Sequence, residues 1–327
     1  MQILSKKQTH TLLLLITFSL FFNPAYAHDQ TNHGNLSLTF ENDIFALTDR
    51  YYTNGVNILW MIPLPENAGE NFTRAVRLSL SQIMYTPSDI TSEKNEKDRP
   101  YAGIACLGAG LEQRFSSHSN LFQMEFGVVG PNSFAGDMQE FVHWLFKLKT
   151  PRGWDGQLNA GPAFTIWGSH KRRIAAGSFR RDWSFEILGH LGGSIGNVVT
   201  AAAGGLEVRA GLNMNNNLGS FFIRPGGEGG TSLAEGYTPA TDASSFSLQV
   251  FAFAGGHGIL RNVFLDGSGR LSSSRIEKRN FVGDLVLGID LRWKPLVFRY
   301  SYVCKTQQFL SQTENHIIGS LNFCYAW

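Results

Sequence analysis

The feature that most constrains the fold is a strict alternation of apolar and polar side chains near the C-terminus. Every second residue on one face is apolar or glycine: Ile317, Gly319, Leu321, Phe323, Tyr325 and Trp327. The opposite face is mostly small or polar: His316, Ser320, Asn322, Cys324 and Ala326. A period of two that ends on an aromatic residue is typical of a strand whose outer face meets lipid.

The same alternation recurs along the chain. The strand upstream has an apolar face, formed by Phe281, Leu285, Leu287, Ile289, Leu291 and Trp293, and its other face carries Asp284, Asp290 and Arg292. Similar stretches occur at 36–40, 52–62, 72–80, 122–128, 183–187, 206–212 and 246–250. In 52–62 the alternation places Thr53 with Gly55 and Asn57, opposite Tyr52. At roughly 25 residues per strand and loop, the sequence predicts an all-β, transmembrane antiparallel β-barrel of about twelve strands.

The N-terminus has the three parts of a secretory signal peptide. Lys6 and Lys7 precede an apolar run at 12–22, and Ala25-Tyr26-Ala27 supplies a small-residue cleavage pattern. The run is shorter than the roughly 20 residues of a transmembrane helix. We therefore expect a signal peptide over residues 1–27, an outer-membrane β-barrel over residues 28–327, and a location in the bacterial outer membrane.

Composition agrees with an exported barrel. The chain has 35 glycines and 25 phenylalanines, only 17% of its residues are charged, and its net charge of +2 favours no nucleic-acid partner. Its three cysteines, Cys106, Cys304 and Cys324, have no metal-binding spacing. The last two lie at opposite ends of a predicted hairpin, so all three are interpreted as packing residues.

One segment departs from the strand pattern. Residues 136–149 place Met138, Phe141, Val142 and Leu145 at helical spacing. This predicts a short amphipathic helix in an extracellular loop, lying against the rim of the barrel. The glycine-rich stretch 255–258, which contains His257, is interpreted as a turn.

Two strand ends carry oxygen ligands. Asn42 and Asp43 end one predicted strand, and Thr53 begins the next. If the two strands form a hairpin, carboxylate, amide and hydroxyl oxygens come together, and these are ligands that suit Ca²⁺. The alternative is that these residues only cap their own turns, as Asn, Asp and Thr often do.

His143 lies on the predicted helix and is a candidate general base, because a neutral imidazole can take a proton from water near pH 7. Gln139, one turn earlier, could orient the ring. The alternative is an ordinary residue on the polar face of the helix. The sequence has no Gly-x-Ser-x-Gly motif, so a serine hydrolase of the α/β kind has no support.

Several motifs together resemble the lipid A 3′-O-deacylase (LpxR) family of outer-membrane enzymes. They are ENDIFALTDRYYTNG at 41–55, DRPYAG at 98–103, GVVGPNS at 127–133 followed by Gln139 and His143, and GWDGQL at 153–158. The family pattern has a lysine after Tyr85-Thr86-Pro87; this chain has Ser92 near that position, and Lys94 and Lys97 a little later.

The resemblance implies a Ca²⁺-dependent ester hydrolase that releases the 3′-linked acyloxyacyl group of lipid A. It implies His143 as the water-activating base, Asn42 and Thr53 as catalytic-site residues, and Asp43 with Asn42 at the metal. The expected partner is lipid A, or lipopolysaccharide, in the outer leaflet, and the expected protein is a membrane-embedded monomer. Two alternatives stay open: a non-catalytic barrel, either pore or structural protein, and an outer-membrane phospholipase.

Overall fold

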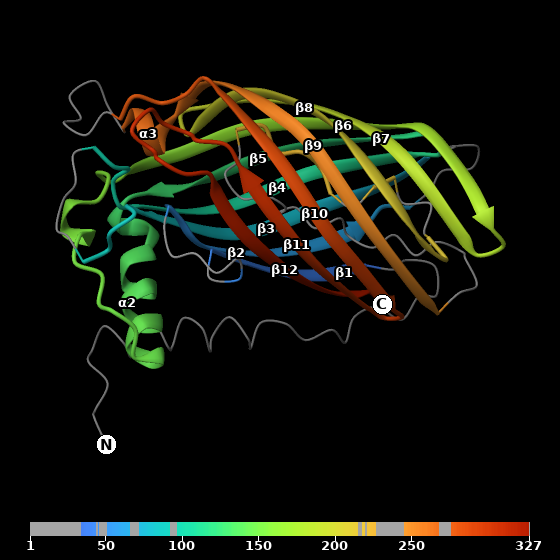
Figure 1. Cartoon of the computed structure of the whole chain (residues 1–327), viewed down its shortest axis with the longest axis horizontal. Coiled ribbons are helices and arrows are strands. Elements are labelled where there is room, and N and C mark those ends of the chain that lie inside the picture. The colour runs from blue at the N-terminus through green and yellow to red at the C-terminus, as the bar shows by residue number, and fades with distance from the viewer. Residues whose placement is uncertain are drawn as a thin grey trace.

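The protein folds into a closed antiparallel barrel (Figure 1). The computed structural model describes residues 34–43, 45, 51–65, 72–91, 97–214, 218–219, 221–226, 245–267 and 276–326. Within these residues there are twelve strands: β1 (Asn35–Asn42), β2 (Tyr51–Pro63), β3 (Phe72–Thr86), β4 (Ala102–Phe115), β5 (His118–Val129), β6 (Gly161–Arg180), β7 (Trp183–Gly196), β8 (Val199–Leu212), β9 (Phe246–Asn262), β10 (Phe281–Trp293), β11 (Leu296–Lys305) and β12 (His316–Ala326). The prediction of about twelve antiparallel strands is confirmed.

Each strand pairs with its neighbours in sequence, and the first strand closes the barrel against the last. β1 pairs with β12 from Asn35 opposite Ala326 to Asn42 opposite Gly319. This closure leaves no sheet edge, so the backbone N–H and C=O groups of the wall have partners within the sheet.

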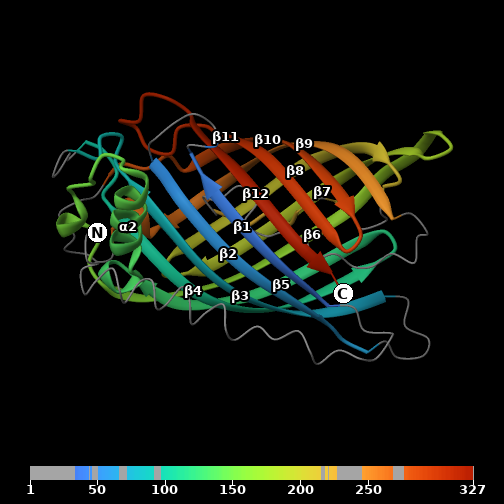
Figure 2. The same cartoon turned by 90° about the horizontal axis from the view of Figure 1, so that it is seen from below.

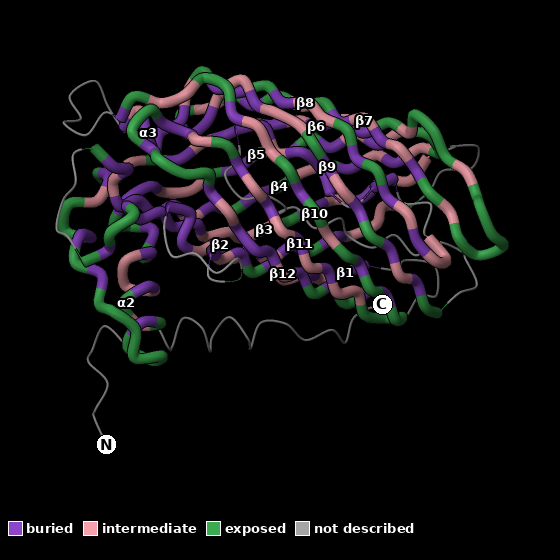
Figure 3. Tube along the Cα trace, viewed as in Figure 1, coloured by how far each residue is buried: buried purple, intermediate pink, exposed green. Residues whose placement is uncertain are grey.

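The two faces of the wall differ as the alternation predicts, and burial changes from residue to residue along the strands (Figure 3). On β12 the residues His316, Ser320 and Asn322 are buried, whereas Phe323 and Tyr325 are 47% exposed. The outer face carries large exposed apolar side chains on many strands, including Leu107, Phe122, Phe126, Leu191, Ile195, Leu206, Val250, Leu285 and Leu287. A closed apolar exterior of this kind fits a lipid surround.

The inner face carries charges that neutralise one another. Salt bridges between neighbouring strands include Arg77–Glu112 at 2.7 Å, Arg209–Glu186 at 2.5 Å, Arg299–Asp290 at 2.5 Å and Lys305–Asp284 at 2.8 Å. Within β4, Arg114 also pairs with Glu112 at 2.6 Å. Buried charges are tolerated only when they are paired and hydrogen-bonded. The charges of the lumen are therefore held in pairs, next to an apolar cluster that includes Ile83, Val286 and Val303.

A segment between β8 and β9, residues 221–226, fills part of the lumen. It enters from the end at which β8 finishes, opposite the end at which β5 finishes. Phe221 stacks on His190 with 5.4 Å between ring centroids, and the Lys171 ammonium lies 4.0 Å from the centre of the Phe222 ring. We call this segment the plug.

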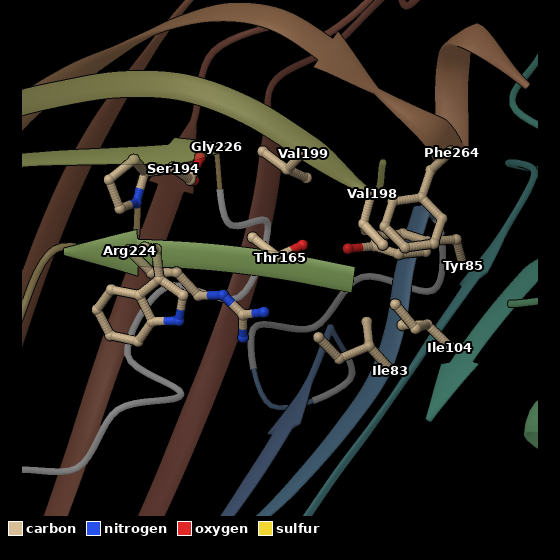
Figure 4. A pocket seen from close by; sticks show the side chains of 12 residues that line it. Ile83, Tyr85, Ile104, Thr165, Ser194, Val198, Val199, Arg224, Gly226 and Phe264 are labelled. Atoms are coloured by element: carbon tan, nitrogen blue, oxygen red, sulfur yellow. The ribbon is translucent and has the colours of Figure 1, made fainter. Parts of the chain in front are cut away.

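Polar contacts fix the far part of the plug. Arg224 forms a salt bridge with Glu125 of β5, and the Pro225 carbonyl accepts a hydrogen bond from Ser194 Oγ at 3.1 Å. Gly226 N donates to His257 Nδ1 at 3.0 Å. The space beside Arg224 is a small cavity, lined among others by Ile83, Tyr85, Ile104, Thr165, Val199 and Phe264 (Figure 4).

The structure contradicts the expected turn at 255–258 and agrees with the expectation for the cysteines. The stretch 255–258 is not a turn but the middle of β9, and His257 Nε2 lies 2.8 Å from Asp284 Oδ2 inside the barrel. Its glycines leave room for neighbours: a Cβ at Gly255 would lie 2.4 Å from the Phe253 ring. All three cysteines are free, as expected. The predicted signal peptide, residues 1–27, lies outside the described residues.

Short helices lie at one end of the barrel. The loop between β5 and β6 contains the 3₁₀ helix η2 (Pro131–Ser133), helix α2 (Ala135–Phe146) and the 3₁₀ helix η3 (Trp154–Gly156). In both views α2 lies beside the ends of β3 and β4, which it contacts (Figures 1 and 2). Helix α3 (Val263–Asp266) follows β9 at the same end. The predicted rim helix is therefore confirmed.

Among the residues that the structure describes, no helix is long and apolar enough to cross a membrane.

The plug generates a test of whether the lumen is a channel. Purified protein in a planar lipid bilayer should show no steady ion conductance, because aromatic side chains and paired charges occupy the lumen. Replacing residues 221–226 by a Gly-Ser segment of equal length should produce conducting events. Arg172→Ala, which alters an exposed side chain of β6, should stay silent. Steady conductance of the unmodified protein would contradict the plug.

Candidate active site

The hairpin of β1 and β2 brings the predicted oxygen ligands together. Asn42, the last residue of β1, is paired with Asn54 of β2, so Thr53 lies next to it across the hairpin. Asp43 follows directly and is 1% exposed. The strand pairing thus brings Asn42 beside Thr53; it ends at Asn42, so the approach of Asp43 to Thr53 stays a prediction.

Thr53 does not lie on the face that the alternation assigned to it. The register between β2 and β3 shifts here: Tyr52 pairs with Tyr85 and Asn54 with Met84, so Thr53 is an extra residue, a β-bulge. Tyr52, predicted to be on the outer face, is instead fully buried in the lumen, where its hydroxyl donates to Glu41 Oε2 at 2.6 Å.

The bulge turns Thr53 away from the lumen, to the outer side of the sheet, where Thr53 and Thr86 are both buried. Its Oγ1 lies 2.6 Å from Thr86 Oγ1 at the end of β3. Thr86 alternates with the inward Tyr85 and shares its face with Met84. The sequence alone did not suggest Thr86 as a site residue. It could have been found from its position, because the alternation of β3 places it on the outer face, next to the hairpin that carries the motif.

Met84 belongs to the seat of helix α2. It packs with Ala135 of α2 and with three other buried residues, Ile90, Tyr101 and Trp154. Gln82, two residues before Met84, donates from Nε2 to the Ser133 carbonyl at 2.6 Å. Since Met84 is the cross-strand partner of Asn54, the seat of α2 adjoins the bulge on the outer wall.

The motifs that resemble the family build this seat. Gly103, from the DRPYAG block, has no room for a side chain, because a Cβ there would lie 2.3 Å from the Ala135 Cβ. Tyr101 donates from its hydroxyl to the Ile90 carbonyl at 2.9 Å. The Asp98 carboxylate accepts from the backbone N and the Oγ of Ser88 at 2.8 and 2.6 Å. These contacts show that the residues of the DRPYAG block hold the loops at this end of the barrel in place.

His143 lies in the last turn of α2 and is 9% exposed. Its Nδ1 contacts the Lys149 carbonyl oxygen. A carbonyl oxygen can only accept, so Nδ1 carries the proton and, in the neutral ring, Nε2 keeps its lone pair. This is the tautomer that a general base acting through Nε2 requires.

Gln139 does not orient His143, contrary to the sequence expectation. Its Oε1 accepts a hydrogen bond from Trp154 Nε1 at 2.7 Å, and its Nε2 makes no hydrogen bond within the described residues. Gln139 therefore fastens α2 to the following 3₁₀ turn, and the Lys149 carbonyl takes the orienting role. Helical spacing could not predict this, because the loop after α2 folds back so that the Lys149 carbonyl reaches His143.

The donor set at the hairpin fits a hard cation in its chemistry. Asp43, Asn42 and Thr53 offer carboxylate, amide and hydroxyl oxygens, and oxygen is the ligand that Ca²⁺ takes. Among the described residues, no group of three or more His, Cys, Asp or Glu side chains is placed to hold a metal ion.

Comparison with known proteins gives a family match and several structural matches. A family model described as outer membrane protein LpxR matches residues 13–327. The solved structure of LpxR from Salmonella typhimurium is similar with a TM-score of 0.74 and 17% sequence identity, covering 89% of this chain and 99% of that chain.

Barrels of other kinds are less similar. The beta domain of the Bordetella autotransporter Brka has a TM-score of 0.45 and 10% identity, covering 90% of this chain and 98% of that chain. The transport unit of the autotransporter AIDA-I from Escherichia coli has a TM-score of 0.39 and 10% identity, with both chains fully covered. A search of curated protein sequences finds no significant match.

The tight contact at Gly103 predicts that a single methyl group loosens α2. Overpacking costs about 1–3 kcal/mol, so Gly103→Ala should accelerate amide hydrogen exchange across residues 135–146 by roughly 10- to 100-fold. Gly161→Ala is the matched control, because a Cβ at Gly161 meets nothing within 4 Å. Equal exchange in the two variants would show that α2 does not depend on this contact.

Proposed function

The chain belongs to the LpxR family of outer membrane proteins, and on this basis we propose that it is a lipid A 3′-O-deacylase. The reaction is hydrolysis of the ester that links the 3′ acyloxyacyl group to the lipid A sugar. The observation that carries the proposal is the pairing of Asn42 with Asn54, beside Thr53, next to the part of the wall on which the first turn of α2 packs. His143 lies in the last turn of the same helix.

The position of this site suits a substrate that stays in the bilayer. Lipid A occupies the outer leaflet, and a site on the outer wall of the barrel meets it there without extraction of its acyl chains. The plug favours an enzyme over a pore, because the described part of the lumen contains paired charges and the aromatic side chains of Phe221 and Phe222.

The proposed chemistry uses one base. His143 Nε2 takes a proton from water, and the water oxygen adds to the ester carbonyl carbon. When the C–O bond to the sugar breaks, the same proton passes from Nε2 to the departing 3′ oxygen, so the balance is one water consumed, one fatty acid and one hydroxyl formed. The Lys149 carbonyl keeps the Nδ1 proton in place throughout.

Asp43, Asn42 and Thr53 would hold a Ca²⁺ ion. When bound, the ion would supply positive charge beside the ester carbonyl, where negative charge develops in the transition state. Ca²⁺ dependence and the monomeric state both stay predictions of this proposal.

The base predicts a large kinetic effect. His143→Ala should lower release of the 3′ acyloxyacyl group by about 10²- to 10⁴-fold, the usual contribution of a positioned base. The measurement is mass spectrometry of lipid A incubated with purified protein. Trp144→Ala, a change at an exposed neighbour on α2, is the matched control. A heat-modifiable His143→Ala barrel that deacylates at the normal rate would make His143 an ordinary helix residue.

The proposed Ca²⁺ ion predicts a loss of activity that can be distinguished from the loss caused by removing the base. Removing Ca²⁺ with a chelator should abolish hydrolysis by the unmodified protein, and added Ca²⁺ should restore it. Asp43→Ala should resemble the chelated protein, because the carboxylate is the only anionic ligand in the proposed set. His143→Ala should not respond to added Ca²⁺. Full activity in the chelator would remove the metal from the mechanism, and release of acyl groups from phospholipid alone would change the substrate.

A further inference from the structure

We propose that His316 is a positioning residue for this site: its imidazole holds the β-bulge that turns Thr53 onto the outer wall. The inference rests on the proposed function, in which Thr53 takes part in the site. His316 is the first residue of β12 and is fully buried. Because it is buried and bonded to the backbone of Tyr52, it would act on Thr53 through Tyr52.

The strands β1 and β2 end at different levels here. β1 ends at Asn42, opposite Asn54, whereas β2 extends further to Tyr51. The strands β2 and β12, which β1 separates elsewhere, come into contact at Tyr52 and His316. The backbone of Tyr52 therefore has no β1 residue opposite it in the ladder, and β12 supplies the neighbour.

His316 supplies the acceptor for this backbone. The Tyr52 N–H donates to His316 Nε2 at 3.1 Å. A buried amide left unpaired costs about 1–3 kcal/mol, so this bond decides whether the bulge is tolerated. The rings of Tyr51 and Tyr52 lie 5.7 and 6.3 Å from the imidazole and confine it.

The bulge in turn decides which side chain faces the site. Along the rest of β2 the odd-numbered residues Asn57, Leu59 and Met61 are buried in the barrel. Regular alternation would place Thr53 inside with them and Tyr52 outside. The extra residue reverses this, and Tyr52 then reaches Glu41, two positions before Asp43. One hydrogen bond to His316 thus orients both strands that carry the proposed ligands.

The test compares a replacement that keeps the acceptor with one that removes it. In His316→Gln the side-chain Oε1 can reach the Tyr52 amide, whereas His316→Leu offers similar bulk and no acceptor. Misplacement of a group by about 1 Å can cost on the order of 10²-fold in rate. We expect His316→Leu to lower kcat on lipid A by about 10- to 100-fold with KM little changed, and His316→Gln to keep most of the activity.

A second measurement is independent of activity. Amide hydrogen exchange in a peptide containing Tyr52 and Thr53 should be faster in His316→Leu than in the unmodified protein, and near normal in His316→Gln. The matched control is His170→Leu, on the outer face of β6, where His170 Nδ1 lies 2.7 Å from Asn120 Oδ1, away from β2. Heat-modifiable migration confirms that each variant is folded.

The outcomes separate the two hypotheses. If His316→Leu keeps normal kcat, or if His316→Gln loses as much as His316→Leu, the positioning role is wrong. If His316→Leu does not fold, His316→Asn takes its place, because its shorter side chain cannot reach the amide and must lose the same kcat. If the unmodified protein leaves lipid A intact, the proposed function fails, and the exchange measurement still decides whether His316 holds the bulge.

Discussion

The closed backbone ladder is the constraint on which the rest of this structure depends. In lipid, every N–H and C=O group of the wall needs a partner within the protein, and only closure of β1 on β12 provides it. The register of that closure, with Asn42 opposite Gly319, also sets where β1 ends relative to β2 and β12. β1 ends before β2 does, and the bulge at Thr53 lies in the part of β2 that extends past β1.

The lumen shows how the barrel tolerates its buried charges. Ion pairs cross from strand to strand, and the plug adds Arg224 as the partner of Glu125. Removing one member of such a pair would leave the other charge uncompensated, at a cost of about 3–5 kcal/mol. The interior is thus a scaffold that stiffens the wall, and this rigidity is what a site on the outer wall needs for fixed geometry.

The site joins two parts of different origin. One part is the hairpin of β1 and β2, whose residues the ladder places with little freedom. The other is α2, which is held by packing of Ala135 over Gly103 and by the bond between Trp154 and Gln139. The helix is fastened at its first turns, and His143 lies in its last turn.

The sequence by itself determined the barrel, its approximate strand number, the rim helix and the hairpin that unites Asn42 with Thr53. Each follows from local periodicity, because a strand with lipid on one side must alternate and a rim helix must not. The tertiary structure alone decided three things: the inward Tyr52, the strand that contains His257, and the carbonyl that orients His143. The first two depend on residues that are distant in the chain, such as Tyr52 and His316 or His257 and Asp284, and the third depends on a loop that folds back on its own helix. The physical reason is that a bulge adds one residue to a single strand and so shifts the alternation after it, and periodicity carries no information about where that residue is inserted.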